Sequence, residues 1–323
     1  MTEWKGTDLN AILTTVLPVF GLIVLGYGAA WAKVVDGDAV RGLSLFVFNI
    51  AIPALLFKTT ATMDMQNVAP WSLWGAYFGG LALSWILASF VSRRVESLNY
   101  SGGAVASMAT GFGNLAMLGT PLALSHFGQQ VGVPLGIILS VHAPILWTAA
   151  TLHREIARHA GSPHWAVMGR ELFNNLARNA IVLSLLAGAL WRFSGLGLPA
   201  IPDKMLDMLA DASVPTALLA LGASLAGYSM RGSLQGMFTL IGLKMVAMPI
   251  FVFILAHTVF PLPPLYAKLA VLFAAMPTGA NAFLFAQRNG EAVPAVSGAV
   301  ALGTGLAAIT ASVLLYLADA GLI

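Results

Sequence analysis

The amino-acid sequence predicts an all-α integral membrane protein of ten transmembrane helices, arranged as two inverted repeats of five helices each. Three observations predict this fold class. The 323 residues are 58% hydrophobic and only 9% charged, with a mean hydropathy of +0.84, whereas a soluble domain is about 25% charged. Apolar segments of about 20 residues, the length that crosses a bilayer, recur along the chain. The two halves of the chain also carry matching interruptions in matching places.

Ten segments are apolar and long enough to be interpreted as membrane spans. The sixth is the shortest, and the fourth and ninth contain glycine, proline and asparagine. The predicted spans are residues 10–32, 40–57, 71–91, 102–124, 133–152, 177–193, 209–228, 235–257, 266–287 and 292–318.

The longest polar connection joins spans five and six and divides the chain. We therefore expect a first five-helix repeat over residues 1–152, a cytoplasmic connecting loop over residues 153–176, and a second, inverted five-helix repeat over residues 177–323.

The two halves are related by a nearly constant offset. Pro53 in span two and Pro215 in span seven are 162 residues apart, and Asn114 and Asn281 in spans four and nine are 167 residues apart. Such an offset indicates an internal repeat. Because each copy has an odd number of spans, the second copy must lie upside down in the membrane, as in many secondary transporters.

Spans four and nine contain stretches that are poorly suited to an unbroken helix. They read Gly-Phe-Gly-Asn-Leu-Ala-Met-Leu-Gly-Thr-Pro at 111–121 and Met-Pro-Thr-Gly-Ala-Asn at 276–281. Glycine loosens a helix and proline removes a backbone donor. Because freed backbone groups in a bilayer need a partner or a wet cavity, we expect both helices to be broken and to face protein or substrate.

The half-helix after each break would begin with unpaired N–H groups and the positive end of the helix dipole. An inverted repeat points two such half-helices at one place, which favours an anion, most simply a carboxylate. The alternative is that the small residues only allow close helix packing. The candidate substrate-binding residues in these stretches are Gly113, Asn114, Gly119, Pro121, Pro277, Thr278, Gly279 and Asn281.

Further candidates lie beside the breaks. Pro53 and Pro215 would unwind spans two and seven next to the site, unless each is only a structural kink. Asn49 lies one turn before Pro53 and would face the same cavity. Lys244 lies within span eight, where a charge is costly and commonly functional. It would attract the anion or pair with an acid, unless its side chain snorkels to the interface. Asp211 is the candidate for proton coupling, with an interfacial, solvated carboxylate as the alternative.

No cofactor and no metal site are expected. The chain has no cysteine, and His153, Glu155 and His159 do not have the spacing of a His-Glu-x-x-His zinc motif. His126 and His142, near span five, are interpreted either as core residues or as proton relays. Neither broken stretch contains Asp or Glu, yet exposed carbonyls also bind sodium, so H⁺ and Na⁺ both stay open as the coupling ion.

Charge indicates the partners and the topology. The net charge of +3 forms no basic run, so no nucleic-acid partner is expected. The expected partners are the lipid bilayer and a small organic anion, with a homodimer left open. Ten Lys and Arg residues fall on one side of the predicted topology and five on the other. Because the cytoplasmic side carries the excess, we expect a multi-pass protein with both termini on the outer side.

Three motifs resemble those of the auxin efflux carrier family of membrane transporters. They are Phe-Asn-Ile-Ala-Ile-Pro-Ala-Leu-Leu-Phe at 48–57, Gly-Asn-Leu-Ala-Met-Leu-Gly-Thr-Pro at 113–121 and Met-Pro-Thr-Gly-Ala-Asn at 276–281. The resemblance covers essentially the whole chain. It implies a scaffold domain and a transport domain whose fourth and ninth helices are broken and cross.

The resemblance also implies a function. The family includes plant auxin carriers and bacterial permeases for malonate and malate, all of which move organic acids. This chain lacks the long hydrophilic loop that the plant carriers have after span five, so it is similar to the short bacterial branch. We expect a secondary active transporter of small carboxylates in a bacterial inner membrane, with elevator-like alternating access, and not an enzyme.

Two alternatives come from other classes of protein. One is a cation-coupled transporter of larger amphipathic or auxin-like anions on the bile-acid-carrier architecture. The remote one is an intramembrane hydrolase, which the sequence disfavours because it has no Gly-x-Ser-x-Gly motif, no paired intramembrane aspartates and no zinc-ligand set.

Overall fold

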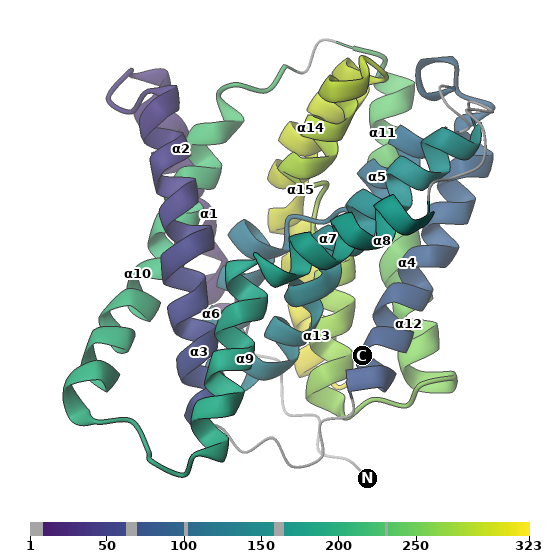
Figure 1. Ribbon diagram of the computed structural model, residues 1–323. Coiled ribbons are helices and arrows are strands. Elements are labelled where there is room, and N and C mark those ends of the chain that lie inside the picture. Colours follow the sequence, from purple (N-terminus) through teal and green to yellow (C-terminus); the bar gives the residue numbers. More distant parts are fainter. Residues whose placement is uncertain (1–8, 63–69, 100–102, 158–164, 230–231) are drawn as a thin grey trace, which may run out of the picture.

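The computed structural model describes residues 9–62, 70–99, 103–157, 165–229 and 232–323, and within them the fold is helical (Figure 1). The one β-type pairing among these residues is an isolated antiparallel bridge between Gly113 and Thr278.

The first half of the chain contains one helix that continues through a π-helical turn and one that is interrupted. Its elements are α1 (Leu9–Trp31), α2 (Gly37–Phe46), η1 (Val47–Ala51), α3 (Ile52–Thr62), α4 (Pro70–Ser92), η2 (Glu96–Leu98), α5 (Ala104–Gly111), η4 (Leu115–Gly119), α6 (Thr120–Phe127), η5 (Gln129–Val131) and α7 (Gly132–Ala157).

The second half repeats both features. Its elements are α8 (Trp165–Ala177), α9 (Ala180–Phe193), α10 (Ala200–Leu225), α11 (Leu234–Gly242), η6 (Leu243–Ala247), α12 (Met248–Thr258), α13 (Pro264–Ala274), α14 (Ala280–Asn289) and α15 (Val293–Asp319).

Seven helical segments of the described chain are long and apolar enough to cross a membrane. They confirm an all-helical membrane protein. The predicted spans at 102–124, 177–193 and 266–287 contain shorter helices: two are interrupted, and α9 has 14 residues. That all ten segments cross the bilayer, and that the halves form an inverted repeat, stay predictions.

Two predicted boundaries differ from the structure. The helix expected at 209–228 begins at Ala200, directly after Pro199, and Asp203 lies in its first turn, where a negative charge is favoured by the helix dipole. The connecting loop expected at 153–176 contains the end of α7 and most of α8. His159 of the proposed histidine group lies outside the described residues.

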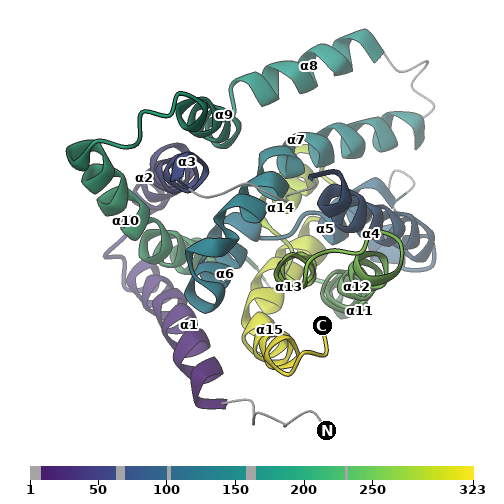
Figure 2. The same cartoon turned by 90° about the horizontal axis from the view of Figure 1, so that it is seen from below.

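The helices form two groups, which Figures 1 and 2 show from the side and from below. Helices α1, α2, α3, α9 and α10 pack together, and α4, α5 and α11 to α15 form the other group. Helix α7 contacts members of both groups. Helix α6 packs against α1 and α10, and its His126 pairs with Asp319 of α15. Each group takes helices from both halves of the sequence, so the spatial division does not follow the division at the connecting loop.

Glycines bring α1 and α10 into backbone contact. A Cβ atom on Gly26 would meet the carbonyl oxygen of Leu219, and a Cβ atom on Gly222 would meet the carbonyl oxygen of Ile23. Membrane helices associate through such close approaches, because lipid offers no hydrophobic driving force between them.

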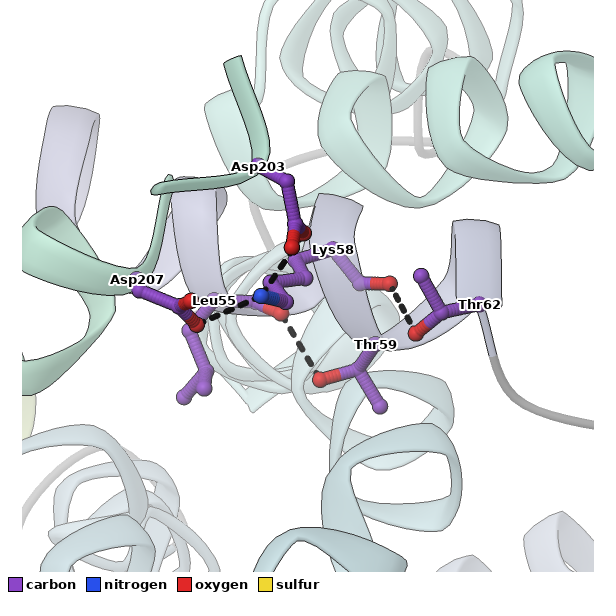
Figure 3. Close-up of polar contacts among 6 residues, drawn as sticks. All are labelled: Leu55, Lys58, Thr59, Thr62, Asp203 and Asp207. Carbon is purple, nitrogen blue, oxygen red and sulfur yellow. Dashed lines mark hydrogen bonds and ion pairs between the residues drawn. The ribbon is translucent and has the colours of Figure 1, made fainter. Parts of the chain in front are cut away.

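An ion-pair cluster joins α3 to α10 in the same group. Lys58 Nζ lies 2.7 Å from an oxygen of Asp203 and 2.5 Å from an oxygen of Asp207 (Figure 3). The two carboxylates are one turn apart on α10, so one ammonium bridges both. Thr59 and Thr62 donate their hydroxyl hydrogens to carbonyls of their own helix. Lys58 is therefore the side chain of this turn that contacts α10.

We expect Gly222→Ala to destabilise the protein by about 1–3 kcal/mol, because the new methyl group must displace the backbone of α1. Thermal unfolding of the detergent-purified protein should show a lower Tm. Gly21→Ala on α1 is the matched control, since no heavy atom lies within 4 Å of the added Cβ atom. Equal melting of the two variants would contradict the close contact.

Candidate functional site

Two helix breaks define the candidate site. Helix α5 ends at Gly111, Phe112 is extended, and the chain turns at Asn114, with φ −77° and ψ 64°, before η4 begins. Helix α13 ends at Ala274, and α14 begins at Ala280 after Gly279 in an extended conformation, with φ −88° and ψ 161°. We call residues 112–114 and 275–279 the paired breaks.

The paired breaks hydrogen-bond to each other. The Asn114 N–H donates to the carbonyl of Pro277 at 2.8 Å, and the Gly279 N–H donates to the carbonyl of Phe112 at 2.8 Å. The Thr278 hydroxyl donates to the carbonyl of Ala109, in the last turn of α5, at 2.9 Å. Backbone groups freed inside a membrane protein must find partners within the protein, and here each break supplies them to the other.

The close approach explains the glycine at the second break. A Cβ atom on Gly279 would lie 3.1 Å from the carbonyl oxygen of Gly113 and 3.2 Å from the nitrogen of Asn114. A side chain at this position would push the two extended segments apart.

A cavity of about 380 Å³ adjoins the paired breaks; we call it the central cavity. Its volume is in the range of small-molecule sites, about 300–1,000 Å³. It is lined by Ser44, Phe48, Phe112, Gly113, Asn114, Leu115, Ala116, Met117, Leu139, His142, Ala143, Asn179, Ile181, Ser224, Gly279, Ala280, Asn281 and Leu284.

Both half-helices begin at this cavity. Ala116 and Met117 lie in the first turn after the first break, and Ala280 and Asn281 lie in the first turn after the second. The first N–H groups of a helix have no acceptor within it, and they carry its positive partial charge. The cavity therefore has two helix N-termini and three asparagines, Asn114, Asn179 and Asn281, on its wall.

Four of the predicted site residues line the central cavity: Gly113, Asn114, Gly279 and Asn281. The other four of the broken stretches lie next to the cavity in the chain but not on its wall. Thr278 and Pro277 hold the pairing between the breaks, Gly119 packs near Met276 and Phe273, and Pro121 is buried at the start of α6.

The structure does not bring the candidates from spans two and seven to the central cavity. Asn49 is exposed, Pro53 is buried in the first turn of α3, and Pro215 is half-buried within a continuous α10. Asp211 is exposed and lines a small pocket of about 120 Å³ together with Lys58 and Asp207. Its role in coupling stays a prediction.

Lys244 lies behind the paired breaks. It is fully buried in the π-helical turn η6, and its ammonium donates to the carbonyl of Ala274 at 2.6 Å and to the sulfur of Met248 at 3.1 Å. In the part of the chain that the structure describes, no carboxylate pairs with it. Because Ala274 ends α13, the ammonium neutralises the negative end of that helix, and a Cβ atom on Gly113 would lie 3.2 Å from it.

Several cavity residues were not found by sequence reasoning. Ser44, Phe48, Asn179 and Ser224 come from α2, η1, the start of α9 and α10. Phe48 begins the motif at 48–57, but no motif indicates that these four residues line a cavity, because their place on its wall depends on how the two groups of helices face each other. His142 was noticed but left open between a core residue and a relay; it lines the cavity.

A second, more polar cavity adjoins the central one. It has a volume of about 470 Å³ and shares Ala143 and Asn179 with the central cavity. Its other lining residues are Pro144, Trp147, Thr148, Thr151, Asn175 and Arg288. The shared residues place a polar, basic space beside the central cavity.

Long apolar helices around a cavity between two facing helix breaks define a membrane transport protein. The chain belongs to the family described as membrane transport protein, whose sequence pattern matches residues 11–315. This confirms the resemblance that the motifs indicate and points to a transporter rather than an enzyme.

Named relatives match along nearly their whole length. A Rhizobium meliloti protein named "Putative malonate transporter" is 29% identical over 95% of both chains. Auxin efflux carrier component 5 of Arabidopsis thaliana is 23% identical over 92% of this chain and 93% of its own. An uncharacterized transporter of Methanothermobacter thermautotrophicus is 25% identical over 92% of this chain and 95% of its own.

Thr278→Val is expected to destabilise the paired breaks by about 1–3 kcal/mol, because it leaves the buried carbonyl of Ala109 without its hydroxyl donor. Thermal unfolding in detergent measures the change. Thr258→Val is the control, since this exposed hydroxyl bonds only within its own helix, and a loss within about 0.5 kcal/mol is expected there. A neutral effect of Thr278→Val would contradict the role of this bond.

Lys244→Ala is expected to abolish anion uptake, because it removes the ammonium that holds the end of α13 behind the breaks. Uptake of a radiolabelled carboxylate into cells with matched membrane levels of the variants measures this. Lys204→Ala, an exposed lysine on α10, should transport normally. Unchanged uptake by Lys244→Ala would remove this residue from the site.

Proposed function

We propose that the protein is a secondary active transporter of small carboxylates such as malonate or malate. The observation that carries the proposal is the central cavity, on whose wall two half-helices begin and three asparagines lie. Backbone N–H groups and helix dipoles at such places bind anions. No carboxylate side chain is among the residues that line this cavity, so nothing there repels a carboxylate substrate.

The proposed architecture has ten spans in two inverted five-helix repeats, with broken helices four and nine crossing at the paired breaks. The central cavity takes residues from both groups of helices, such as Ser224 on α10 and Asn281 on α14. A substrate bound there would lie between the groups, which supports an elevator-like shift of one group against the other.

The proposed setting is a bacterial inner membrane with both termini outside. The excess of Lys and Arg on one side of the predicted topology supports it. The name of the Rhizobium meliloti relative supports a short dicarboxylate as substrate.

A second candidate is a transporter of larger, amphipathic or auxin-like anions. The apolar side chains on the cavity wall favour it, because Phe48, Phe112 and Leu139 would shield an aromatic ring from water. The name of the Arabidopsis thaliana relative points the same way.

Uptake into liposomes tests both candidates. We expect purified protein to accumulate radiolabelled malonate or malate, and phenylacetate only if the second candidate holds. A folded protein that moves no member of an organic-anion panel would refute the proposal.

Asn114→Asp and Asn281→Asp are each expected to reduce uptake at least tenfold, a change of about 1.4 kcal/mol, because a carboxylate on the cavity wall repels the substrate. Gln287→Glu adds the same charge at an exposed position of α14 and should transport normally. Equal transport by all three variants would show that the anion binds elsewhere.

A further inference from the structure

His142 is a buried histidine on the wall of the central cavity. It lies on α7, is 3% exposed and lines the cavity. None of the other residues that line the cavity has a charged side chain. Neither ring nitrogen has a hydrogen-bond partner among the described residues. Buried polar atoms nearly always have a partner, so an exception calls for an explanation such as a ligand, an ion or a water molecule.

Aromatic rings surround the imidazole but give its two nitrogens no hydrogen bond. The ring centroid of Phe112 lies 4.8 Å from that of His142, in an edge-to-face arrangement, and those of Tyr77 and Phe78 lie 5.9 Å and 6.4 Å away. The hydroxyl of Tyr77 is buried and also has no partner among the described residues. The ring is thus fixed in place by apolar contacts, while its two nitrogens are left for something that enters the cavity.

The groups that surround His142 supply no negative charge, so a bound anion would be its counter-ion. The titratable groups that face it are Tyr77 from α4 and the ammonium of Lys244 from η6. Within the described part of the chain no carboxylate pairs with His142, and it is the one titratable side chain among the residues that line the central cavity. A proton on His142 therefore finds its negative partner only when an anion occupies the cavity.

We propose that His142 is a substrate-binding residue that takes up one proton with each bound anion. This rests on the proposed function. The protonated imidazole donates a hydrogen bond to the carboxylate, and the carboxylate in turn stabilises the imidazolium. Because the coupling between two ligands is reciprocal, the proton and the anion bind and leave together, so the carrier moves both in the same direction.

The pH dependence of anion binding tests this inference. In sodium-free buffer, the Kd of the wild-type protein for malonate should rise up to about tenfold per pH unit between about pH 6.5 and pH 8.5, where ordinary carboxylates stay ionised. In His142→Gln the Kd should change less than about twofold over the same range. During net uptake of malonate, liposomes with this variant should lack the internal acidification that the wild type produces.

His257→Gln is the matched control. This histidine lies on α12, is exposed and bonds to the carbonyl of Phe253 in its own helix, so its replacement should leave the wild-type pH dependence in place. If His142→Gln keeps the wild-type slope and acidification, the inference is overturned while malonate transport stands. If the wild type neither binds nor moves any organic anion, the proposed function fails, and the inference falls with it.

Calorimetry of the wild-type protein gives a result that does not depend on how the variant folds. The binding enthalpy of malonate, measured near pH 7.5 in two buffers of different ionisation enthalpy, reports the number of protons taken up per anion. A value near one is expected. A value of zero, with malonate bound, overturns the inference and leaves the transporter proposal intact.

Discussion

The structure depends on two short main-chain hydrogen bonds between helix breaks that are far apart in the sequence. In a bilayer, an interrupted helix leaves N–H and C=O groups that lipid cannot satisfy. Asn114 and Gly279 solve this problem together, because each donates its N–H to a carbonyl of the opposite break. Neither interruption would be tolerable alone, so the two stretches constrain each other and fix the centre of the molecule.

The surroundings of the paired breaks follow from this constraint. Gly279 is required by the approach of the facing backbone, and Lys244 supplies a positive charge at the carbonyl that ends α13. A buried ammonium without a carboxylate is costly. It is tolerated here because the end of a helix carries negative partial charge. The same breaks bring the N-termini of two half-helices to the cavity, so the pairing that satisfies the backbone also shapes the cavity wall.

The cavity lies where the two groups of helices meet, and this explains its mixed wall. The breaks contribute amides and helix N-termini, whereas η1 and α10 contribute Phe48 and Ser224. Away from the cavity, glycines hold α1 against α10 and Lys58 links α3 to α10. These contacts hold α1, α3 and α10 of the first group together.

The sequence by itself determined the class of protein, its helical character and the positions of the two interruptions, because apolar length and the positions of glycine and proline are local properties. It places Asn114 and Asn281 in or beside these interruptions for the same reason. It did not find Asn179 or Ser224 and left His142 undecided, since the place of a side chain on a cavity wall depends on helices that are distant in the chain. Only the tertiary structure decided that Lys244 lies behind the breaks and that Asp211 lies beside Lys58, because burial and pairing are set by packing between helices and not by the order of residues within one.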